Sequence, residues 1–153
     1  MTTNRKAEEP KPRKLFTVQE ANDLLPTLRL LLAHLQAAYR RAQDRFHELE
    51  LLKAVGKKED GTLIMAYDYR LTKQAFERTV ERVNHLVEKI NATGVRLRHI
   101  ELGLVDFPAR IDGEEVLLCW QYGEDSVQYY HGPDEGFSGR KPIPQKLLET
   151  GNS

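Results

Sequence analysis

The sequence has very little cysteine and no excess of charge of either sign. Cys119 is the only cysteine in the 153 residues, so no disulfide can form within the chain and a reducing compartment is expected. The 23 basic side chains balance the 23 acidic ones, whereas a protein that holds a nucleic-acid backbone needs a sizeable basic excess. The balance argues against nucleic-acid binding, although it leaves room for a local basic patch.

Long apolar runs and recognised catalytic signatures are missing as well. The N-terminus, residues 1–14, is polar and rich in charge and proline, without the apolar segment of a signal peptide. The leucine-rich stretch 24–35 is too short to span a bilayer, and Pro26, Arg29 and His34 make it too polar. P-loop, GxGxxG, paired CxxC, HExxH and GxSxG patterns are absent, which removes several large enzyme classes. We expect a soluble cytoplasmic protein without membrane contact.

Apolar periodicity predicts two long helices. Thr17 and Glu20 have the spacing of a capping box at the start of the first helix, and Pro26 predicts a kink or a division into two helices. A second helix begins near 67–71, and Gly94 suits its C-terminal end. Apolar positions alternate at spacings of four and three, as in coiled-coil seams. They are Leu25, Leu28, Leu32, Leu35, Tyr39, Ala42, Phe46 and Leu49, then Phe76, Val80, Val83, Val87 and Ile90. Two such seams predict an antiparallel helical hairpin.

Beyond residue 94 the apolar period changes to two, which predicts a small antiparallel β-meander. Asp112-Gly113 is a strong two-residue hairpin turn. Residues 116–120 are apolar on both faces, which indicates that 115–122 is a central strand, and 123–126 makes a second turn. We therefore predict an α+β fold, with a coiled-coil-like helical hairpin followed by the β-meander. Its parts are a disordered tail (1–14), the hairpin (15–94), the meander and a glycine-rich loop packed on the hairpin base (95–143), and a frayed tail (144–153), in which 144–148 could form one helical turn.

Strand register decides which side chains share a face of the sheet. The two-residue turn places Asp106 opposite Cys119. A four-residue second loop would place Leu118 opposite His131 on the face that covers the helices, and Cys119 opposite Tyr130 on the other face. An odd loop length would move His131 to the other face, and the residues alone leave both registers open.

The glycine-rich loop after the last of these strands holds the best candidates for a site. His131, Glu135 and Asp106 carry groups that ligate metals or exchange protons near neutral pH, so they are candidate catalytic residues. His131 and Glu135 are also candidate ligands of a divalent metal, and Arg140 is a candidate anion clamp. Structural roles compete with these: a strand-edge hydrogen bond for His131, an ion pair that pins the loop for Arg140, and an inert buried thiol for Cys119.

A second possible metal set lies on the helices. Glu81, His85 and Glu88 share one helical face at spacings of four and three, as carboxylate–histidine metal sites do. The set lies opposite the apolar seam, whereas di-metal bundles direct their ligands inward. A solvated charged stripe is therefore the better interpretation.

Several motifs between Phe16 and Ile143 occur together. They are Phe16-Thr17-x-x-Glu20-Ala21-Asn22-x-Leu24-Leu25-Pro26, then Gly103-Leu104-Val105-Asp106-Phe107-Pro108, Glu115-Val116-Leu117-Leu118-Cys119-Trp120 and Gly123-Glu124, and finally Tyr130-His131 with Glu135-Gly136-Phe137-x-Gly139-Arg140-x-Pro142-Ile143. In this combination the chain resembles bacterial domain-of-unknown-function family 2203 (DUF2203), small uncharacterised proteins of which some are labelled cell-division-like. The resemblance implies that one set of residues belongs together: Asp106, Trp120, His131, Glu135, Gly136 and Arg140. It adds Trp120 and Tyr130 as candidate ligand contacts, with Tyr130 standing where the family favours tryptophan.

These observations lead to two expectations for function. The first is a non-enzymatic interaction or scaffold module that associates through its helices, as a homodimer or with a protein partner. The second is a small enzyme, or a binder of a metal or anionic ligand, with a site around His131, Glu135, Asp106 and Arg140. No cofactor is expected except a divalent metal in the second case.

Overall fold

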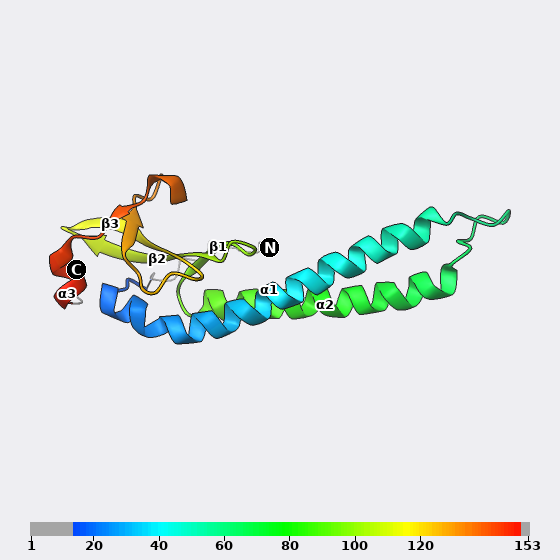
Figure 1. Cartoon of the computed structure of the whole chain (residues 1–153), viewed down its shortest axis with the longest axis horizontal. Helices are drawn as coiled ribbons and strands as arrows, with labels where there is room; N and C mark the ends of the chain where they lie inside the picture. The colour runs from blue at the N-terminus through cyan, green and yellow to red at the C-terminus, as the bar shows by residue number, and fades with distance from the viewer. Residues whose placement is uncertain (1–13, 151–153) are drawn as a thin grey trace, which may run out of the picture.

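Two long helices form a rod, and a small sheet packs on one end of it (Figure 1). The structure is a computed structural model that describes residues 14–150. Helix α1 spans Val18–Ala54 and helix α2 spans Ala66–Ala92, and the two lie side by side. The predicted α+β fold with a helical hairpin is confirmed. The tail predicted over 1–14 lies, apart from its last residue, outside the described residues, as do positions 151–153.

Local sequence explains the start of α1. The Thr17 hydroxyl accepts the Glu20 N–H at 3.0 Å, and the Glu20 carboxylate accepts the Thr17 N–H at 3.0 Å, so the capping box is present. The helix continues through Pro26, so the division into two helices, one of the two expected alternatives, does not occur. The neighbouring Leu25 and Leu28 are buried, and this burial offsets the hydrogen bond that proline cannot donate.

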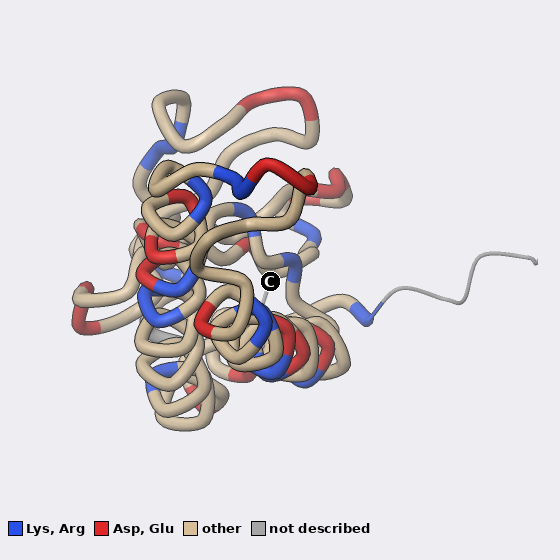
Figure 2. The backbone as a smooth tube through the Cα atoms, turned by 90° about the vertical axis from the view of Figure 1, so that its right-hand side faces the viewer, with Lys and Arg blue, Asp and Glu red and all other residues tan. Residues whose placement is uncertain are grey.

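The two halves of the helical hairpin differ in burial. Near the sheet, Leu28, Leu32 and Leu35 are fully buried. In the far half, which the sheet does not cover, Phe46 is 53% exposed although it lies on the same predicted seam (Figure 1). Viewed along the rod, acidic and basic residues surround the outside of the helices (Figure 2). No helix within residues 14–150 is both long enough and apolar enough to cross a membrane.

Beyond α2, the segment 96–142 contains a five-stranded antiparallel sheet whose strands lie in sequence order. The strands are β1 (Arg96–His99), β2 (Leu104–Ile111), β3 (Glu114–Gln121), β4 (Tyr129–His131) and β5 (Lys141–Pro142). Strand β3 lies in the middle, as predicted. The turn between β2 and β3 has positive φ at both Asp112 (51°) and Gly113 (82°), which matches a two-residue hairpin turn.

The glycine-rich loop is followed by a short strand at the edge of the sheet. A 3₁₀ turn, η1, forms over Phe137–Gly139, and β5 then pairs with β4. This pairing stabilises a strand of only two residues. Ile143 extends this pairing by donating its N–H to the Gln128 carbonyl at 2.9 Å. Helix α3 (Gln145–Thr150) follows, within the segment expected to fray apart from one helical turn.

The register of β4 is the feature that decides the site. Strands β2 and β3 pair as predicted, but β3 and β4 pair with Leu117 opposite His131. This is one residue away from the pairing that a four-residue loop predicts, so that alternative is wrong. The loop is longer because Asn22 of α1 accepts the Val127 N–H at 2.8 Å and holds it against the helix. As a result His131 lies on the same face of the sheet as Asp106.

The core lies between the other face of the sheet and the near half of the hairpin. Trp120 is completely buried there, and its Nε1 donates to the Glu124 carbonyl at 3.0 Å. The turn before β2 depends on Gly103, which has φ +67° and would place an added Cβ only 2.5 Å from Tyr122 Cβ. Only glycine fits this turn without displacing its neighbour.

Candidate functional site

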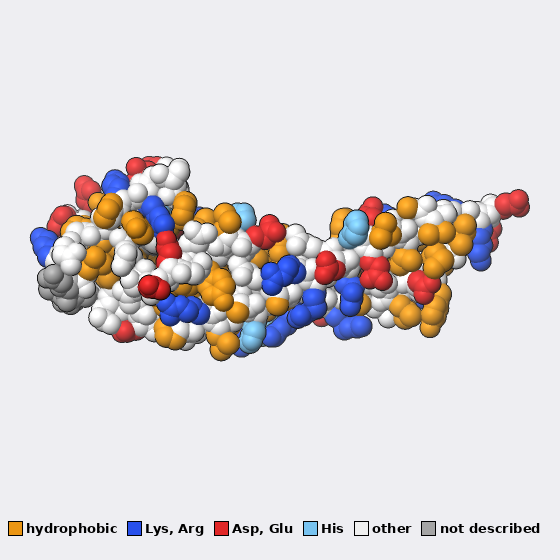
Figure 3. All heavy atoms as spheres, in the orientation of Figure 1, with side chains coloured by type: hydrophobic (Ala, Val, Ile, Leu, Met, Phe, Trp, Pro, Cys, Tyr) orange, Lys and Arg blue, Asp and Glu red, His pale blue; other side chains and the backbone are white. Residues whose placement is uncertain are grey.

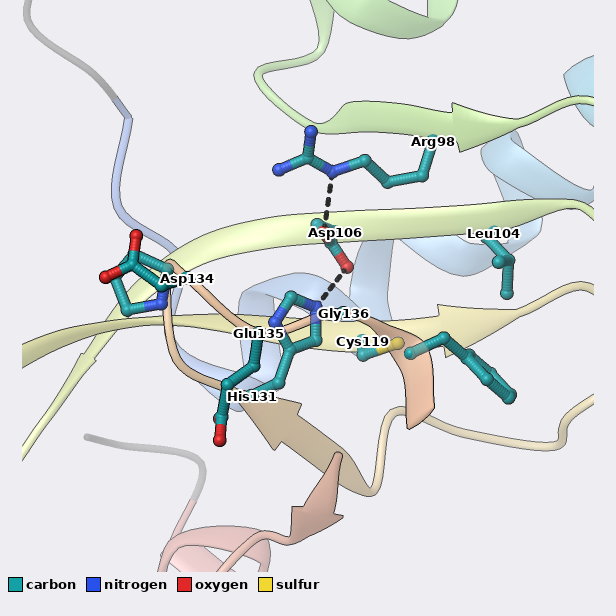
Figure 4. Close-up of a pocket in the computed structure, with 10 residues that line it drawn as sticks. Arg98, Leu104, Asp106, Cys119, His131, Asp134, Glu135 and Gly136 are labelled. Atoms are coloured by element: carbon teal, nitrogen blue, oxygen red, sulfur yellow. Dashed lines mark hydrogen bonds and ion pairs between the residues drawn. The ribbon is translucent and has the colours of Figure 1, made fainter. Parts of the chain in front are cut away.

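Three possible metal ligands meet on the outer face of the sheet. Asp106 on β2 and Cys119 on β3 are cross-strand partners, and the ring of His131 on β4 points toward them (Figure 4). All three are buried. Within residues 14–150 they form one group of His, Cys, Asp and Glu whose donor atoms all lie within 4.8 Å of one another. Strand register thus builds a compact donor cluster from three separate segments.

Hydrogen bonds hold Asp106 from two sides. Its Oδ2 accepts from Arg98 Nε at 2.8 Å, and its Oδ1 lies 3.1 Å from His131 Nε2 (dashed lines in Figure 4). The other ring nitrogen of His131, Nδ1, lies 2.8 Å from the Gly132 carbonyl oxygen. The Arg98 side chain is 45% exposed and that of Asp106 only 4%. The network is therefore buried around His131 and reaches solvent through Arg98.

Both ring nitrogens of His131 face oxygen atoms. The Gly132 carbonyl can only accept, so Nδ1 carries a proton. In a neutral imidazole Nε2 then has a lone pair, and this lone pair is directed at a carboxylate oxygen of Asp106. Such an approach is favourable only with a further proton or a cation between the two atoms. Metal-binding histidines commonly donate their second N–H to a backbone carbonyl in this manner.

Cys119 lies beside this pair as a buried thiol. Burial, reinforced by the charge of Asp106, raises the pKa of Cys119 from 9.0 to about 11, although the nearby Arg140 guanidinium opposes the shift. The thiol therefore keeps its proton at neutral pH, and it becomes a thiolate ligand when a metal ion displaces that proton.

A pocket of about 340 Å³ adjoins the cluster. Arg98 and Leu104 line it from the sheet, and residues 133–137 line it from the loop. This volume is within the range of small-molecule sites. Because residues 133–137 are exposed, the pocket opens to solvent at the loop and ends at the buried donor cluster.

Glu135 lines the pocket without joining the donor cluster. Its Oε1 accepts the Gly132 N–H at 2.7 Å and lies 3.7 Å from Lys141 Nζ. The hydrogen bond from Gly132, followed by the charge of Lys141, lowers the pKa of Glu135. In Figure 4 its carboxylate points away from Asp106 and His131. The structure thus places this predicted ligand at the pocket mouth, and its binding role stays a prediction.

Arg140, the predicted anion clamp, is engaged elsewhere. Both of its terminal nitrogens donate to the Glu124 carboxylate, with 3.1 Å between Nη1 and Oε1. Its guanidinium also stacks at 4.1 Å from the Tyr129 ring and 4.2 Å from the Phe137 ring. Burial raises the pKa of Glu124, but hydrogen bonds, chiefly that from Arg140, outweigh burial and lower it overall. This paired guanidinium does not line the pocket.

The site lies within a family domain. The family model described as an uncharacterized conserved protein (DUF2203) matches residues 14–143. The chain belongs to the DUF2203 family. The match confirms the resemblance drawn from the sequence motifs, and it spans the pocket and its donor cluster. No curated protein and no solved structure gives a significant match.

Two further residues that the DUF2203 resemblance singled out lie on the opposite face of the sheet. Trp120 is in the core, and Tyr130, which pairs with Leu118, packs partly buried against the same core. Neither lines the pocket. The helix residues Glu81, His85 and Glu88 are all exposed, as expected of a solvated stripe.

Arg98 and Cys119 are the site residues that sequence reasoning did not assign. For Cys119 a signal existed, since the Asp112-Gly113 turn already placed it opposite Asp106. For Arg98 the signal was weaker, because its contact with Asp106 depends on the pairing of β1 with β2, where Arg96 lies opposite Asp106.

Proposed function

We propose that this DUF2203 protein binds a divalent transition-metal ion, Zn²⁺ above all, through Asp106, Cys119 and His131. The observation that carries the proposal is the convergence of three buried donors around a histidine that already directs its other nitrogen to a backbone carbonyl. If Asp106 and His131 formed only a structural ion pair, the thiol of Cys119 beside them would have no role in it. Carboxylate, thiolate and imidazole together are the ligand types that zinc takes in proteins.

The spacing of the donors suits a small ion. Zinc bond lengths in a tetrahedral site keep the ligand atoms about 3.3–3.7 Å apart, and the three donor atoms lie within 4.8 Å of one another. Small side-chain rotations close that difference. Three protein ligands leave one position open toward the pocket, as in catalytic rather than structural zinc sites, so a small-enzyme role is compatible with this site.

The charge of Arg98 and the proton of the Cys119 thiol both affect the affinity of the site for a metal ion. Arg98 weakens the attraction of Asp106 for a cation, but it also fixes the carboxylate through Oδ2 and leaves Oδ1 directed at His131. Because the pKa of Cys119 is about 11, metal uptake at neutral pH must expel the thiol proton. At pH values below that pKa, the affinity for the metal should therefore rise about tenfold for each unit by which the pH is raised. An unoxidised thiol ligand also fits a reducing cytoplasm.

Cobalt titration tests the metal site directly. Protein stripped of metal with a chelator and then dialysed is titrated with Co²⁺ at pH 6.5, 7.5 and 8.5, and the thiolate-to-cobalt absorption band is recorded. We expect one ion per chain, tighter binding at higher pH, and displacement of Co²⁺ by Zn²⁺. Isothermal calorimetry with Zn²⁺ gives an independent affinity.

Variants separate this site from adventitious binding. Cys119→Ser should abolish the absorption band, and His131→Gln should weaken zinc binding by at least about tenfold. His34→Gln, on the exposed surface of α1 and away from the pocket, serves as the control that should bind like the wild type. Zinc binding that is absent in the wild type, or unchanged in both site variants, would refute the proposal.

We also propose, from a separate observation, that the far half of the helical hairpin pairs with a second copy of the chain. An apolar groove of about 520 Å³ lies there between α1 and α2. Its lining residues are Tyr39, Ala42, Gln43, Phe46, Phe76, Val80 and Val83. The Phe46 and Phe76 ring centroids are 6.0 Å apart, and this apolar face is only partly covered by the two helices themselves.

A second copy fits this groove because the groove continues the stripe that the sheet covers in the near half. A two-fold axis would bring the same stripe of both copies together as four helices. Arg40 and Glu50 are both exposed on α1 and lie about 15 Å apart along its axis. Antiparallel copies would bring these opposite charges together, in exchange for the contact of Glu50 with Lys53 at 3.3 Å. The face is only about 20 Å wide and roughly 16 Å long, well below the ~800 Å² per partner of a stable interface, so the dimer should be weak.

Sedimentation equilibrium over a wide concentration range tests self-association. The wild type should show a monomer–dimer equilibrium at tens to hundreds of micromolar, and Phe46→Glu should be monomeric throughout. Leu51→Glu is the matched control, since Leu51 is 58% exposed and does not line the groove. A wild type that stays monomeric at high concentration, or equal weakening by both variants, would contradict this assignment.

A further inference from the structure

The face of the helical hairpin opposite the apolar groove carries a compact group of arginines. A hollow of about 310 Å³ lies between α1 and α2, lined by Arg41 and Arg45 from α1 and by Arg78 and Arg82 from α2. These four residues are named the arginine quartet. Ala75 and Thr79 complete the lining. In Figure 3 the corresponding stretch along the lower edge of the rod shows a run of basic side chains.

Acidic side chains do little to neutralise the arginine quartet. Arg45 Nη1 lies 3.6 Å from Glu48 Oε1, and both side chains are about half exposed. Among the residues that the structure describes, no carboxylate forms an ion pair with Arg41, Arg78 or Arg82. Like charges at positions i and i+4 destabilise a helix by about 0.2–0.5 kcal/mol per pair, and the quartet contains one such pair on each helix. The arginine quartet therefore carries a repulsion that the single contact between Arg45 and Glu48 offsets only in part.

The dimensions of the arginine quartet suit a small ligand with several negative charges. Four residues along a helix span about 6 Å, and packed helices lie about 8–10 Å apart. The four arginine side chains thus leave the two helices at the corners of a rectangle of about 6 by 9 Å. The small side chains of Ala75 and Thr79 between them leave room for an anion to enter between the four arms.

The chemistry of the lining points to phosphate groups. Guanidinium forks bind phosphate oxygens in pairs, which makes arginine better suited than lysine to planar two-point contacts. Among the described residues, no aromatic ring lines the hollow, so these residues offer no surface on which a nucleobase could stack, as bases do in proteins that bind single strands. An extended nucleic-acid strand would also need a longer basic stripe than this compact array supplies.

We propose that the arginine quartet binds a compact oligophosphate, two or three linked phosphate groups, either free or at the end of a nucleoside. The phosphates lie between Arg41 and Arg45 on one side and Arg78 and Arg82 on the other. This site is separate from the donor cluster on the sheet and from the apolar groove, so its test does not depend on metal binding or on self-association. It also accounts for a strong local positive patch in a chain whose net charge is zero.

Calorimetric titration tests the proposal on the full-length, metal-free protein in a phosphate-free buffer without magnesium. The titrants are inorganic triphosphate, ATP, orthophosphate, citrate and a 12-nucleotide single strand. We expect triphosphate and ATP to bind alike within about threefold, and both to bind at least tenfold more tightly than orthophosphate or citrate. Affinity should fall steeply with added salt.

A matched pair of double variants locates the site. Arg41→Gln with Arg78→Gln should weaken triphosphate binding about 10–100-fold, as expected when two charge-assisted hydrogen-bonding groups are lost. Arg40→Gln with Arg70→Gln removes the same charge from exposed positions that do not line the hollow and should bind nearly as the wild type does. Circular dichroism verifies that both variants are folded.

Each remaining outcome overturns the assignment. Equal weakening in the two double variants would show non-specific attraction to positive charge. Citrate that binds as tightly as triphosphate would remove the selectivity for phosphate. A single strand that binds much more tightly than triphosphate would replace the compact ligand with nucleic acid, and ATP that binds far more tightly than triphosphate would mean that the nucleoside is recognised.

Discussion

Replacing Asp106 and His131 by alanine, singly and together, would measure how strongly the buried pair at the centre of the site stabilises the fold. The two side chains are 4% and 3% exposed and are joined by the 3.1 Å contact between Oδ1 and Nε2. A double-mutant cycle isolates their interaction because each single variant removes the same contact. Metal-free protein must be used so that only the pair is measured.

The expected coupling follows from burial and charge. Hydrogen bonds to charged groups contribute about 1.5–3 kcal/mol, and the burial of both residues limits how far water replaces the lost partner. Asp106 also keeps its second contact, from the half-exposed Arg98, which softens the loss in the His131 variant. We therefore expect a coupling energy of about 2 kcal/mol.

Urea unfolding followed by Trp120 fluorescence is a direct assay, since Trp120 is the single tryptophan and is completely buried. With a slope of about 2 kcal/mol per molar urea, 2 kcal/mol moves the midpoint by about 1 M. The matched control is the pair Arg110 and Glu115 on the same two strands, whose atoms are 3.9 Å apart and whose side chains are half exposed. Its coupling should be about 0–0.5 kcal/mol.

The result that refutes this reasoning is additivity. If the Asp106 and His131 single variants sum to the double variant within about 0.5 kcal/mol, the contact between them contributes nothing. A coupling energy equal to that of the exposed control pair would also refute the reasoning, because burial would then have no effect on the strength of the interaction.

Three further predictions address the turn, the thiol and the helix cap. Gly103→Ala should cost about 2–3 kcal/mol by thermal unfolding because of positive φ and the clash with Tyr122, whereas Gly113→Ala, which has open space around it, should cost only about 1 kcal/mol from its backbone conformation. Folding raises the pKa of Cys119 from 9.0 to about 11, so the stability that the protonated thiol contributes is full below pH 9 and is lost as the pH rises to 11. The wild type should therefore lose stability relative to Cys119→Ala between pH 9 and 11. An unchanged difference in stability between the two proteins over that range would contradict the raised pKa. Thr17→Ala should lower stability by about 1 kcal/mol through loss of the cap bond, and an unchanged melting temperature would count against that role.

Part of the site was open to prediction from the sequence. The two-residue turn at Asp112-Gly113 sets the pairing of β2 with β3, so Asp106 opposite Cys119 followed from local rules. The side of the sheet on which His131 lies did not follow, because it depends on the length of the loop before β4. The contact partners of Arg140 were equally hidden, since Glu124 and the aromatic rings approach it only after the loop has folded back.

The sequence by itself determined the elements whose interactions span a few residues. The capping box of Thr17 and Glu20, the apolar stripes of both helices and the Asp112-Gly113 turn all form within a few residues of the chain. Tertiary structure alone decided where the stripes are covered and which face His131 occupies. A bond from α1 to Val127, between residues 105 positions apart, holds the loop before β4. A slip of one residue there reverses the face of every side chain that follows, so the meeting of Asp106, Cys119 and His131 was settled by packing and not by local pattern.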